Sequence, residues 1–239
     1  MHSHLPAARR AMLLSIVIGA AIGLVFSPAC RIRYVTVVGP TEAIAAEVAA
    51  GLRLPAQANT VFLPLTRVQA RATECYRVKR LTVRRRSPKE IVIRVHERQP
   101  MAALVSPDSG YTVIDDEGMA LVRTDTPGLL PVAEGVVGQR PELGRIISPE
   151  ALSLLKACIE AAEQDGMDQK LRLDLSDPHM ITMQTADGVV GKLGDKHHLR
   201  RKTVMFGRLL KALQDQPGQI EYIDVSTESA PTFRRRARN

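Results

Sequence analysis

The chain has 239 residues, and its 33 Lys and Arg against 25 Asp and Glu give it a net charge of +8. This length allows one or two domains with cores of their own. Aromatic residues make up only 3% of the chain and tryptophan is missing, so the stacking platforms of single-strand binders are poorly supplied. We therefore expect no nucleic-acid partner, and a solvated basic surface with some attraction to anionic lipid headgroups.

An uncharged apolar run extends from Ala11 to Ala29, and no second run of that length follows. As a helix it would be about 28 Å long, close to the thickness of a bilayer's hydrocarbon core. We therefore expect a transmembrane helix at 11–29 after a cytoplasmic tail at 1–10. Two arginines lie on either side of the run, so basic residues alone do not set the orientation. The short tail favours a single pass with the bulk of the chain outside the cytoplasm.

Two alternatives to a retained anchor remain open. Ser27 and Ala29 are small residues at the spacing of a signal-peptide cleavage site, and cleavage would release a periplasmic binding protein. Cys30 would be the lipidated residue of a lipoprotein, although Ser27 replaces the large aliphatic residue usual before it. The apolar stretch up to Phe26 is long for a signal-peptide core, which favours retention.

The next region has the pattern of a small β-α-α-β-β unit. Thr41 is expected to cap the first helix, with Glu42 placed favourably for the helix dipole. The two last strands alternate apolar and polar residues around a turn at 86–89 and form the clearest hairpin of the chain. The expected elements are a strand at 33–39, a helix from Thr41, a helix at 65–74, and strands at 78–85 and 90–97.

From Met101 onward the pattern predicts a second, α+β domain with an antiparallel-rich sheet and two helices. Ser148 is expected to cap the first of these helices, with Pro149 at its first position. Asp195 is a plausible cap for the second. The expected strands are 111–114, 119–123, 171–175, 180–185, 189–193, 221–225 and a short one at 231–235, and the expected helices begin at Ser148 and span 196–214.

Two clusters could suggest enzymatic chemistry, and neither is convincing. Asp115, Asp116 and Glu117 lie in a turn between strands, where Asp is favoured because its side chain hydrogen-bonds the backbone of the turn. His197 and His198 are adjacent, so on a helix they point about 100° apart and cannot share one metal on one face. The chain also lacks a nucleophile elbow and a glycine-rich phosphate loop. We therefore expect no enzyme, no cofactor, no metal site and no small-molecule substrate.

The cysteines and the arginine run have ordinary interpretations. Cys30, Cys75 and Cys158 are too widely spaced for a metal site, and Cys158 fits a small core residue. A disulfide between Cys75 and Cys158 is possible in an oxidising compartment but is not expected. The arginines at 84–86 lie near a strand end and are expected to form a solvated rim.

Six short motifs in order along the chain resemble the bacterial cell-division protein family FtsQ/DivIB. The most specific is the stretch 95–102, which reads VHERQPMA and is similar to the family's V-x-E-R-x-P-x-A junction between two domains. The others are Val35, Val37 and Gly39; the strand and turn 111–118; Leu130, Pro131 and Gly135; Leu193, Gly194, Leu199 and Lys202; and 223–225. The resemblance spans nearly the whole chain.

This resemblance implies an uncleaved, single-pass protein of the cell inner membrane with a POTRA domain at 33–99 and a β domain at 100–226. It implies a non-enzymatic divisome scaffold that recruits and bridges septal proteins during septation. Its expected partners are other divisome membrane proteins, including small bitopic coiled-coil proteins. A different POTRA-bearing assembly or secretion factor is the alternative, although such proteins usually carry tandem POTRA units.

In the family, the partner adds a strand near the C-terminal strand, which here would be an edge strand and basic tail at 227–239. The partner-binding residues implied by this mapping are Thr227, Ser229, Phe233 and Arg235. The sequence departs from the family at this point. Ser226 and Thr227 replace the usual Arg-Tyr pair, and Pro231 removes one backbone donor from the edge. Phe233 remains as an apolar anchor.

Overall fold

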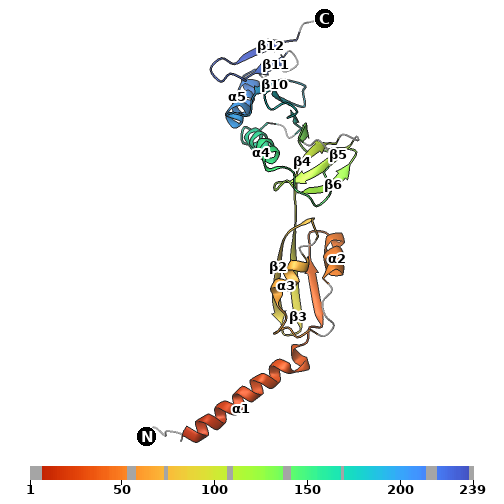
Figure 1. Cartoon of the computed structure of the whole chain (residues 1–239), viewed down its shortest axis with the longest axis vertical. Helices are drawn as coiled ribbons and strands as arrows, with labels where there is room; N and C mark the ends of the chain where they lie inside the picture. Colours follow the sequence, from red (N-terminus) through yellow and green to blue (C-terminus); the bar gives the residue numbers. More distant parts are fainter. Residues whose placement is uncertain are drawn as a thin grey trace. The chain divides into compact units, whose positions relative to one another are not determined.

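The computed structural model describes residues 7–52, 58–72, 75–106, 110–136, 141–167, 170–213 and 220–236. The chain divides into two units, Met1–Glu97 and Arg98–Asn239, each with its own core (Figure 1). Parts of the expected tails, 1–6 and 237–239, lie outside the described residues. The expected helix ends at Glu74 and Gln214 lie outside them too.

The first unit begins with helix α1, Ala7–Phe26, followed by a short 3-10 turn, η1, at Pro28–Cys30. Ser27 ends α1 because its backbone is extended and its side chain caps the turn. Along α1, large apolar side chains are exposed: Met12, Leu13, Leu14, Ile16, Val17, Ile18, Ile22, Leu24 and Phe26. Within the described part of the chain, no helix combines the length and apolarity needed to cross a membrane. The transmembrane helix expected at 11–29 is therefore not found, and the helix observed in this region spans Ala7–Phe26.

The rest of this unit has the predicted β-α-α-β-β order, which is confirmed. Strand β3 lies in the middle of a three-stranded sheet of order β1-β3-β2, parallel to β1 and antiparallel to β2. The elements are β1 (Tyr34–Val38), α2 (Glu42–Gly51), α3 (Leu65–Ala72), β2 (Val78–Ser87) and β3 (Glu90–Glu97).

A small apolar core joins the two helices of this unit to one face of the sheet. Thr41 caps α2 as expected, because its side chain accepts a hydrogen bond from the Ile44 N–H. Alternate residues of the hairpin point toward the helices, so the opposite sheet face carries the polar residues. The core residues are Ile44, Val48, Leu52 and Val68 from the helices and linking turn, and Val78, Leu81, Ile91, Ile93 and Val95 from the strands.

The second unit is a mixed α+β domain, as predicted. Its described strands form one sheet of order β12-β11-β10-β9-β8-β7-β4-β5-β6, with five antiparallel and three parallel neighbour pairs. The strands are β4 (Pro100–Val105), β5 (Tyr111–Asp115), β6 (Ala120–Thr124), β7 (Val132–Glu134), β8 (Arg172–Asp174), β9 (Ile181–Gln184), β10 (Val190–Gly194), β11 (Ile220–Asp224) and β12 (Thr232–Arg235).

Helices α4 (Pro149–Gln164) and α5 (Leu199–Ala212) pack against each other, and α5 also contacts β10 and β11. Ser148 caps α4 as expected, accepting a hydrogen bond from the Ala151 N–H. Phe206 of α5 is fully buried against β10, where an ideal Cβ placed on Gly191 would lie 2.8 Å from the aromatic ring. Glycine at this position therefore lets the helix approach the sheet.

The start of α5 differs from the prediction. The helix begins at Leu199 rather than Lys196, and His198 before it has a left-handed backbone with φ of 54°. Asp195 does not cap the helix. Its carboxylate instead accepts hydrogen bonds from the backbone N–H of His197 and from Nζ of Lys202, at 3.2 and 2.7 Å. Lys202 is a buried cation one helical turn into α5, and a buried cation needs a charged partner. The Asp195 carboxylate therefore pairs with Lys202 and does not cap the helix.

Candidate functional site

The sheet of the second unit ends at β12, the last described strand. In the described sheet, β12 pairs only with β11, antiparallel, with Phe233 opposite Ile223. All four of its residues are exposed. The outer edge of β12 therefore presents backbone N–H and C=O groups that can pair with another strand.

Phe233 lies on the helix-bearing face of this edge. Directly opposed residues of an antiparallel pair project to the same face, and Ile223 is buried in the core that includes α5. Phe233 nevertheless remains 49% exposed because none of the described elements covers it at the edge. The guanidinium carbon of Arg235 lies 6.0 Å from the centre of the Phe233 ring, at the outer limit of a cation–π contact.

Thr227 and Ser229, which the family mapping assigned to the edge strand and tail at 227–239, do not lie on the edge strand. They are exposed in the loop between β11 and β12. The loop turns early because Asp224 accepts hydrogen bonds from the N–H and hydroxyl of Ser226, and the Ala230 N–H then bonds the Thr227 carbonyl. Of the predicted partner residues, the structure brings only Phe233 and Arg235 together on the strand.

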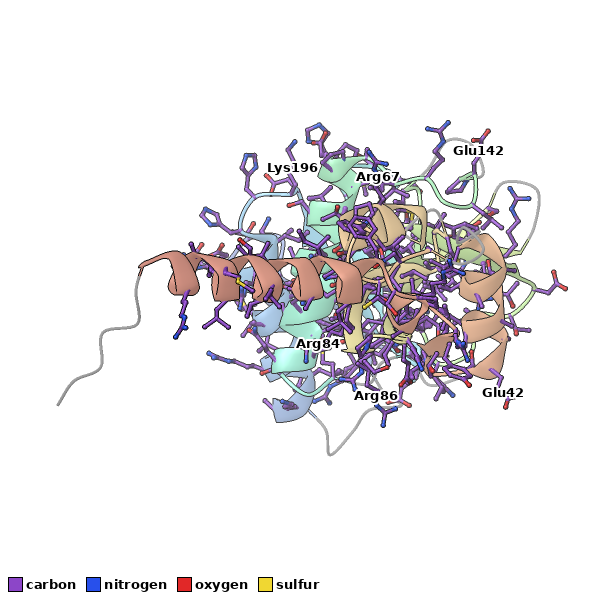
Figure 2. All side chains as sticks on the ribbon, turned by 90° about the horizontal axis from the view of Figure 1, so that it is seen from below. Glu42, Arg67, Arg84, Arg86, Glu142 and Lys196 are labelled. Atoms are coloured by element: carbon purple, nitrogen blue, oxygen red, sulfur yellow. The ribbon has the colours of Figure 1, made fainter. Side chains whose placement is uncertain are left out.

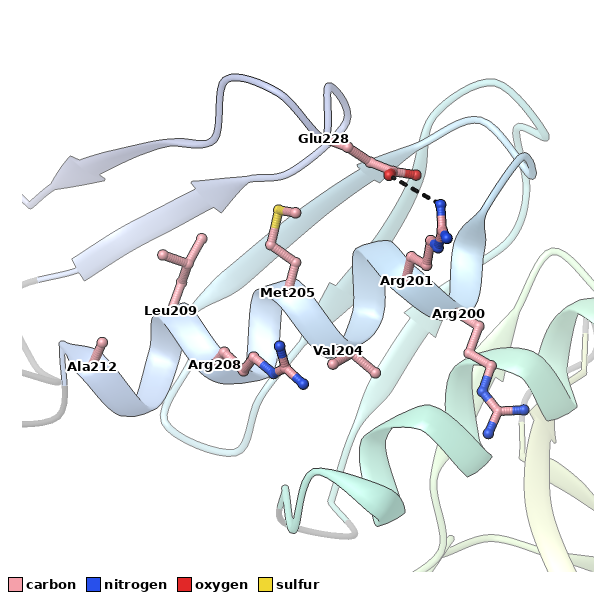
Figure 3. Close-up of a pocket in the computed structure, with 8 residues that line it drawn as sticks. All are labelled: Arg200, Arg201, Val204, Met205, Arg208, Leu209, Ala212 and Glu228. Carbon is pink, nitrogen blue, oxygen red and sulfur yellow. Dashed lines mark ion pairs between the residues drawn. The ribbon is translucent and has the colours of Figure 1, made fainter.

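A groove of about 630 Å³ runs along α5 beside this loop (Figure 3). Met205 and Leu209 project from the helix toward the loop, and Glu228 of the loop forms a 4.0 Å ion pair with Arg201. Its lining has an apolar part, Val204, Met205, Leu209 and Ala212, and a charged part, Arg200, Arg201, Arg208 and Glu228.

The charge of the groove is positive. Arg200 donates a hydrogen bond to Gln164, whereas the exposed Arg208 has no hydrogen-bond or ion-pair partner within the described ranges. The lining of the groove therefore combines three arginines with one acid along a partly apolar helix surface. Such a surface suits an acidic, amphipathic partner segment. This surface was not among the expected sites, although the helical spacing of Arg201, Met205 and Leu209 indicates it in the sequence.

The acidic cluster at 115–117 is a turn, as expected, and it also contains an ion pair that was not anticipated. Asp115 is fully buried, and its Oδ1 accepts the backbone N–H groups of Glu117 and Met119. Nη1 of Arg98 lies 2.6 Å from a carboxylate oxygen of Asp115 and 2.6 Å from one of Glu117. Burial alone would lower the Arg98 pKa, but these hydrogen bonds outweigh it and the pKa is raised. The cluster is therefore structural.

The histidine pair also has a structural environment. Nδ1 of His197 lies 3.0 Å from Asp195, whose pKa is lowered by hydrogen bonds from Lys202 first and His197 second. Among the residues that the structure describes, no three His, Cys, Asp or Glu side chains are grouped as metal ligands would be. Cys30, Cys75 and Cys158 are free thiols, and burial raises the pKa of Cys158 to about 12.

Comparison with known families places these features in context. Residues 30–98 match the model of the FtsQ-type POTRA domain, and residues 103–226 match the model of the C-terminal region of cell division protein FtsQ/DivIB. The chain belongs to the FtsQ/DivIB family. This family consists of non-enzymatic division proteins, so membership implies a role in cell division at the septum among other divisome proteins.

Compared with individual curated proteins, this FtsQ/DivIB chain has no significant match. The second family match ends at residue 226, within the loop before β12, so the edge site rests on the geometry alone.

Proposed function

We propose that this FtsQ/DivIB protein is a divisome scaffold that recruits and bridges septal proteins by adding a partner strand to β12. The observation that carries the proposal is the open edge of β12 next to the basic groove of α5. A strand added to β12 gains main-chain hydrogen bonds that demand little of its sequence. Contacts with the side chains of the groove would make binding selective for particular partners, which main-chain pairing alone does not.

The chemistry of the site defines the partner. An extended segment paired with β12 would cover Phe233, removing its exposed apolar surface from water. A neighbouring helical segment with acidic residues would lie against Arg208 and contact Met205 and Leu209. The proposed partner is a small bitopic coiled-coil division protein that carries such a segment.

The test is co-purification of the full chain with the small bitopic division proteins of the same cell. Phe233→Ala is expected to weaken binding about tenfold, since burying half of a large side chain is worth roughly 1 to 1.5 kcal/mol. Arg208→Glu is expected to weaken it at least as much through like-charge repulsion. Both side chains are exposed, so the fold should be unaffected.

Val122→Ala provides the matched control, because Val122 is an exposed residue of β6 at the opposite edge of the same sheet. This variant should retain full binding. Equal loss in Val122→Ala, or full binding by both site variants, would contradict the proposal. Truncation before Ser226 should abolish binding while thermal unfolding of the core stays cooperative.

We further propose that α1 attaches the protein to the inner membrane, with both units on the extracytoplasmic side. The support is the row of large apolar side chains that α1 exposes, which would be costly in water. The measurement is flotation of the full chain with neutral phosphatidylcholine vesicles. Recovery of the chain with the vesicles is expected, and its retention in the aqueous fraction would refute membrane attachment.

A further inference from the structure

One end of the POTRA unit is built around the end of α1. The amide of Asn59 donates a 2.7 Å hydrogen bond to the Val25 carbonyl at the C-terminal end of α1. The Thr60 N–H bonds the Cys30 carbonyl, and the Arg33 N–H bonds the carbonyl of Lys89 in the β2–β3 turn. The loop after residue 58, the start of β1 and the hairpin turn are therefore all at the end of the unit that α1 joins.

This end carries a cluster of basic residues, which we call the basic end: Arg31, Arg33, Arg84, Arg86 and Lys89. All five are exposed, and Figure 2 labels Arg84 and Arg86. Glu90 is the nearby acid, and it pairs with Arg86 at 3.4 Å. The side chains of Arg33 and Arg84 have no hydrogen-bond or ion-pair partner within the described ranges. The expected solvated rim is thus correct for Arg84.

Arg85 is the exception in the arginine run. Its guanidinium donates hydrogen bonds to the carbonyls of Thr60 and Leu63, at 2.7 and 2.8 Å. It therefore holds the loop after residue 58 against the hairpin and does not belong to the basic end. A hollow of about 350 Å³ lies beside Arg85 on the sheet. Its lining is rich in cations and could receive an anionic group. The lining residues are Thr82, Arg84, Arg85, Arg86, Val92, Arg94 and His96.

Aromatic and aliphatic side chains surround the same end. Phe26 of α1 and Phe62 of the loop have ring centres 5.2 Å apart, and both rings remain more than half exposed. Tyr34 and Val61 are exposed as well. Aromatic rings and basic side chains together are typical of protein surfaces at the level of lipid headgroups, where one part of the site is wet and the other apolar.

We propose that the basic end binds the headgroups of anionic phospholipids, and so seats the POTRA unit on the membrane surface. Guanidinium groups donate paired hydrogen bonds to phosphate oxygens, and the exposed phenylalanines would enter the boundary between headgroups and acyl chains. A lipid surface fits better than an acidic protein segment because the basic residues adjoin the exposed apolar helix α1. The inference rests on the proposed membrane attachment by α1.

The experiment compares vesicle binding of the full chain to neutral and anionic membranes. Partition coefficients are measured by flotation for phosphatidylcholine vesicles with and without phosphatidylglycerol. Binding through α1 is common to both, so the ratio of the two coefficients isolates the headgroup contribution. Each arginine near an anionic surface contributes roughly fivefold to binding, so Arg33→Gln with Arg84→Gln should lower the ratio about 25-fold. Raising the ionic strength should lower the ratio for the unaltered chain, since salt screens the attraction.

The matched control replaces Arg123 and Arg145, exposed arginines of the second unit, by glutamine. It makes the same change in net charge and should leave the ratio unaltered. A second measurement needs no variant: phenylglyoxal should modify Arg84 more slowly on anionic than on neutral vesicles, while Arg123 reacts equally on both.

The outcomes separate the two proposals. Equal ratios for the Arg33/Arg84 variant and the unaltered chain would overturn the headgroup proposal, as would protection of Arg84 by an acidic peptide such as polyglutamate but not by anionic vesicles. A chain that ignores neutral vesicles yet binds anionic ones through Arg33 and Arg84 supports the headgroup proposal and refutes attachment by α1.

Discussion

Replacing Arg98 by methionine tests whether the buried ion pair at the start of the second unit stabilises it. The Arg98 side chain is 12% exposed and Asp115 is fully buried, so water cannot readily replace the lost hydrogen bond to Asp115. Glu117 is 51% exposed and can be hydrated instead. The cost of the substitution therefore falls mainly on Asp115.

The expected loss is about 3 kcal/mol in the free energy of unfolding, the low end for breaking a buried pair. Two observations support a loss at the low end of this range. Asp115 keeps its hydrogen bonds from the Glu117 and Met119 N–H groups, at 3.0 and 2.8 Å. The Nε of Arg98 is buried without a partner among the described residues, so its removal recovers part of the desolvation cost. For a unit of this size the midpoint of thermal unfolding should fall by about 9 °C.

Calorimetry of the full chain measures this change, with Arg172→Met as the matched control. Arg172 pairs with Glu134 at 3.0 Å, but both side chains are substantially exposed, so its loss should cost less than about 1 kcal/mol. A double-mutant cycle of Arg98→Met and Asp115→Asn should give a coupling free energy of about 1 to 3 kcal/mol. Equal effects of Arg98→Met and Arg172→Met, or a coupling near zero, would refute the argument.

Two further predictions concern α5. The Asp195 pKa is lowered in the folded state, so unfolding takes up a proton as the pH falls below about 4, the ordinary pKa of aspartate, and stability decreases with it. Asp195→Asn should flatten the dependence of the unfolding midpoint on pH in this acid range, and an unchanged dependence would contradict the role of Lys202. Gly191→Ala should destabilise the second unit by about 1 to 3 kcal/mol in urea unfolding, because the new methyl group meets the Phe206 ring. Gly51→Ala in α2 has open space and should be neutral or slightly stabilising, so similar losses for both would show that the packing argument fails.

The sequence by itself determined many, though not all, of the local elements of this protein; β4, β7 and the start of α5 were not predicted. Alternating strands around the turn at 86–89 predicted the hairpin, and Thr41 and Ser148 marked helix starts that the structure confirms. These features depend on residues a few positions apart, whose spacing is visible in the chain. The motifs around the stretch 95–102 likewise indicated the family that the matches at 30–98 and 103–226 show.

Only the tertiary structure decided which of these elements and side chains meet. The pair of Arg98 with Asp115 joins residues 17 positions apart, and the bond from Arg85 to Thr60 spans 25. The pairing of β12 with β11 at the sheet edge and the groove along α5 follow from the order of strands in the sheet. That order depends on long-range packing of buried apolar faces, which fixes neighbours in space and leaves no periodic signal in the sequence.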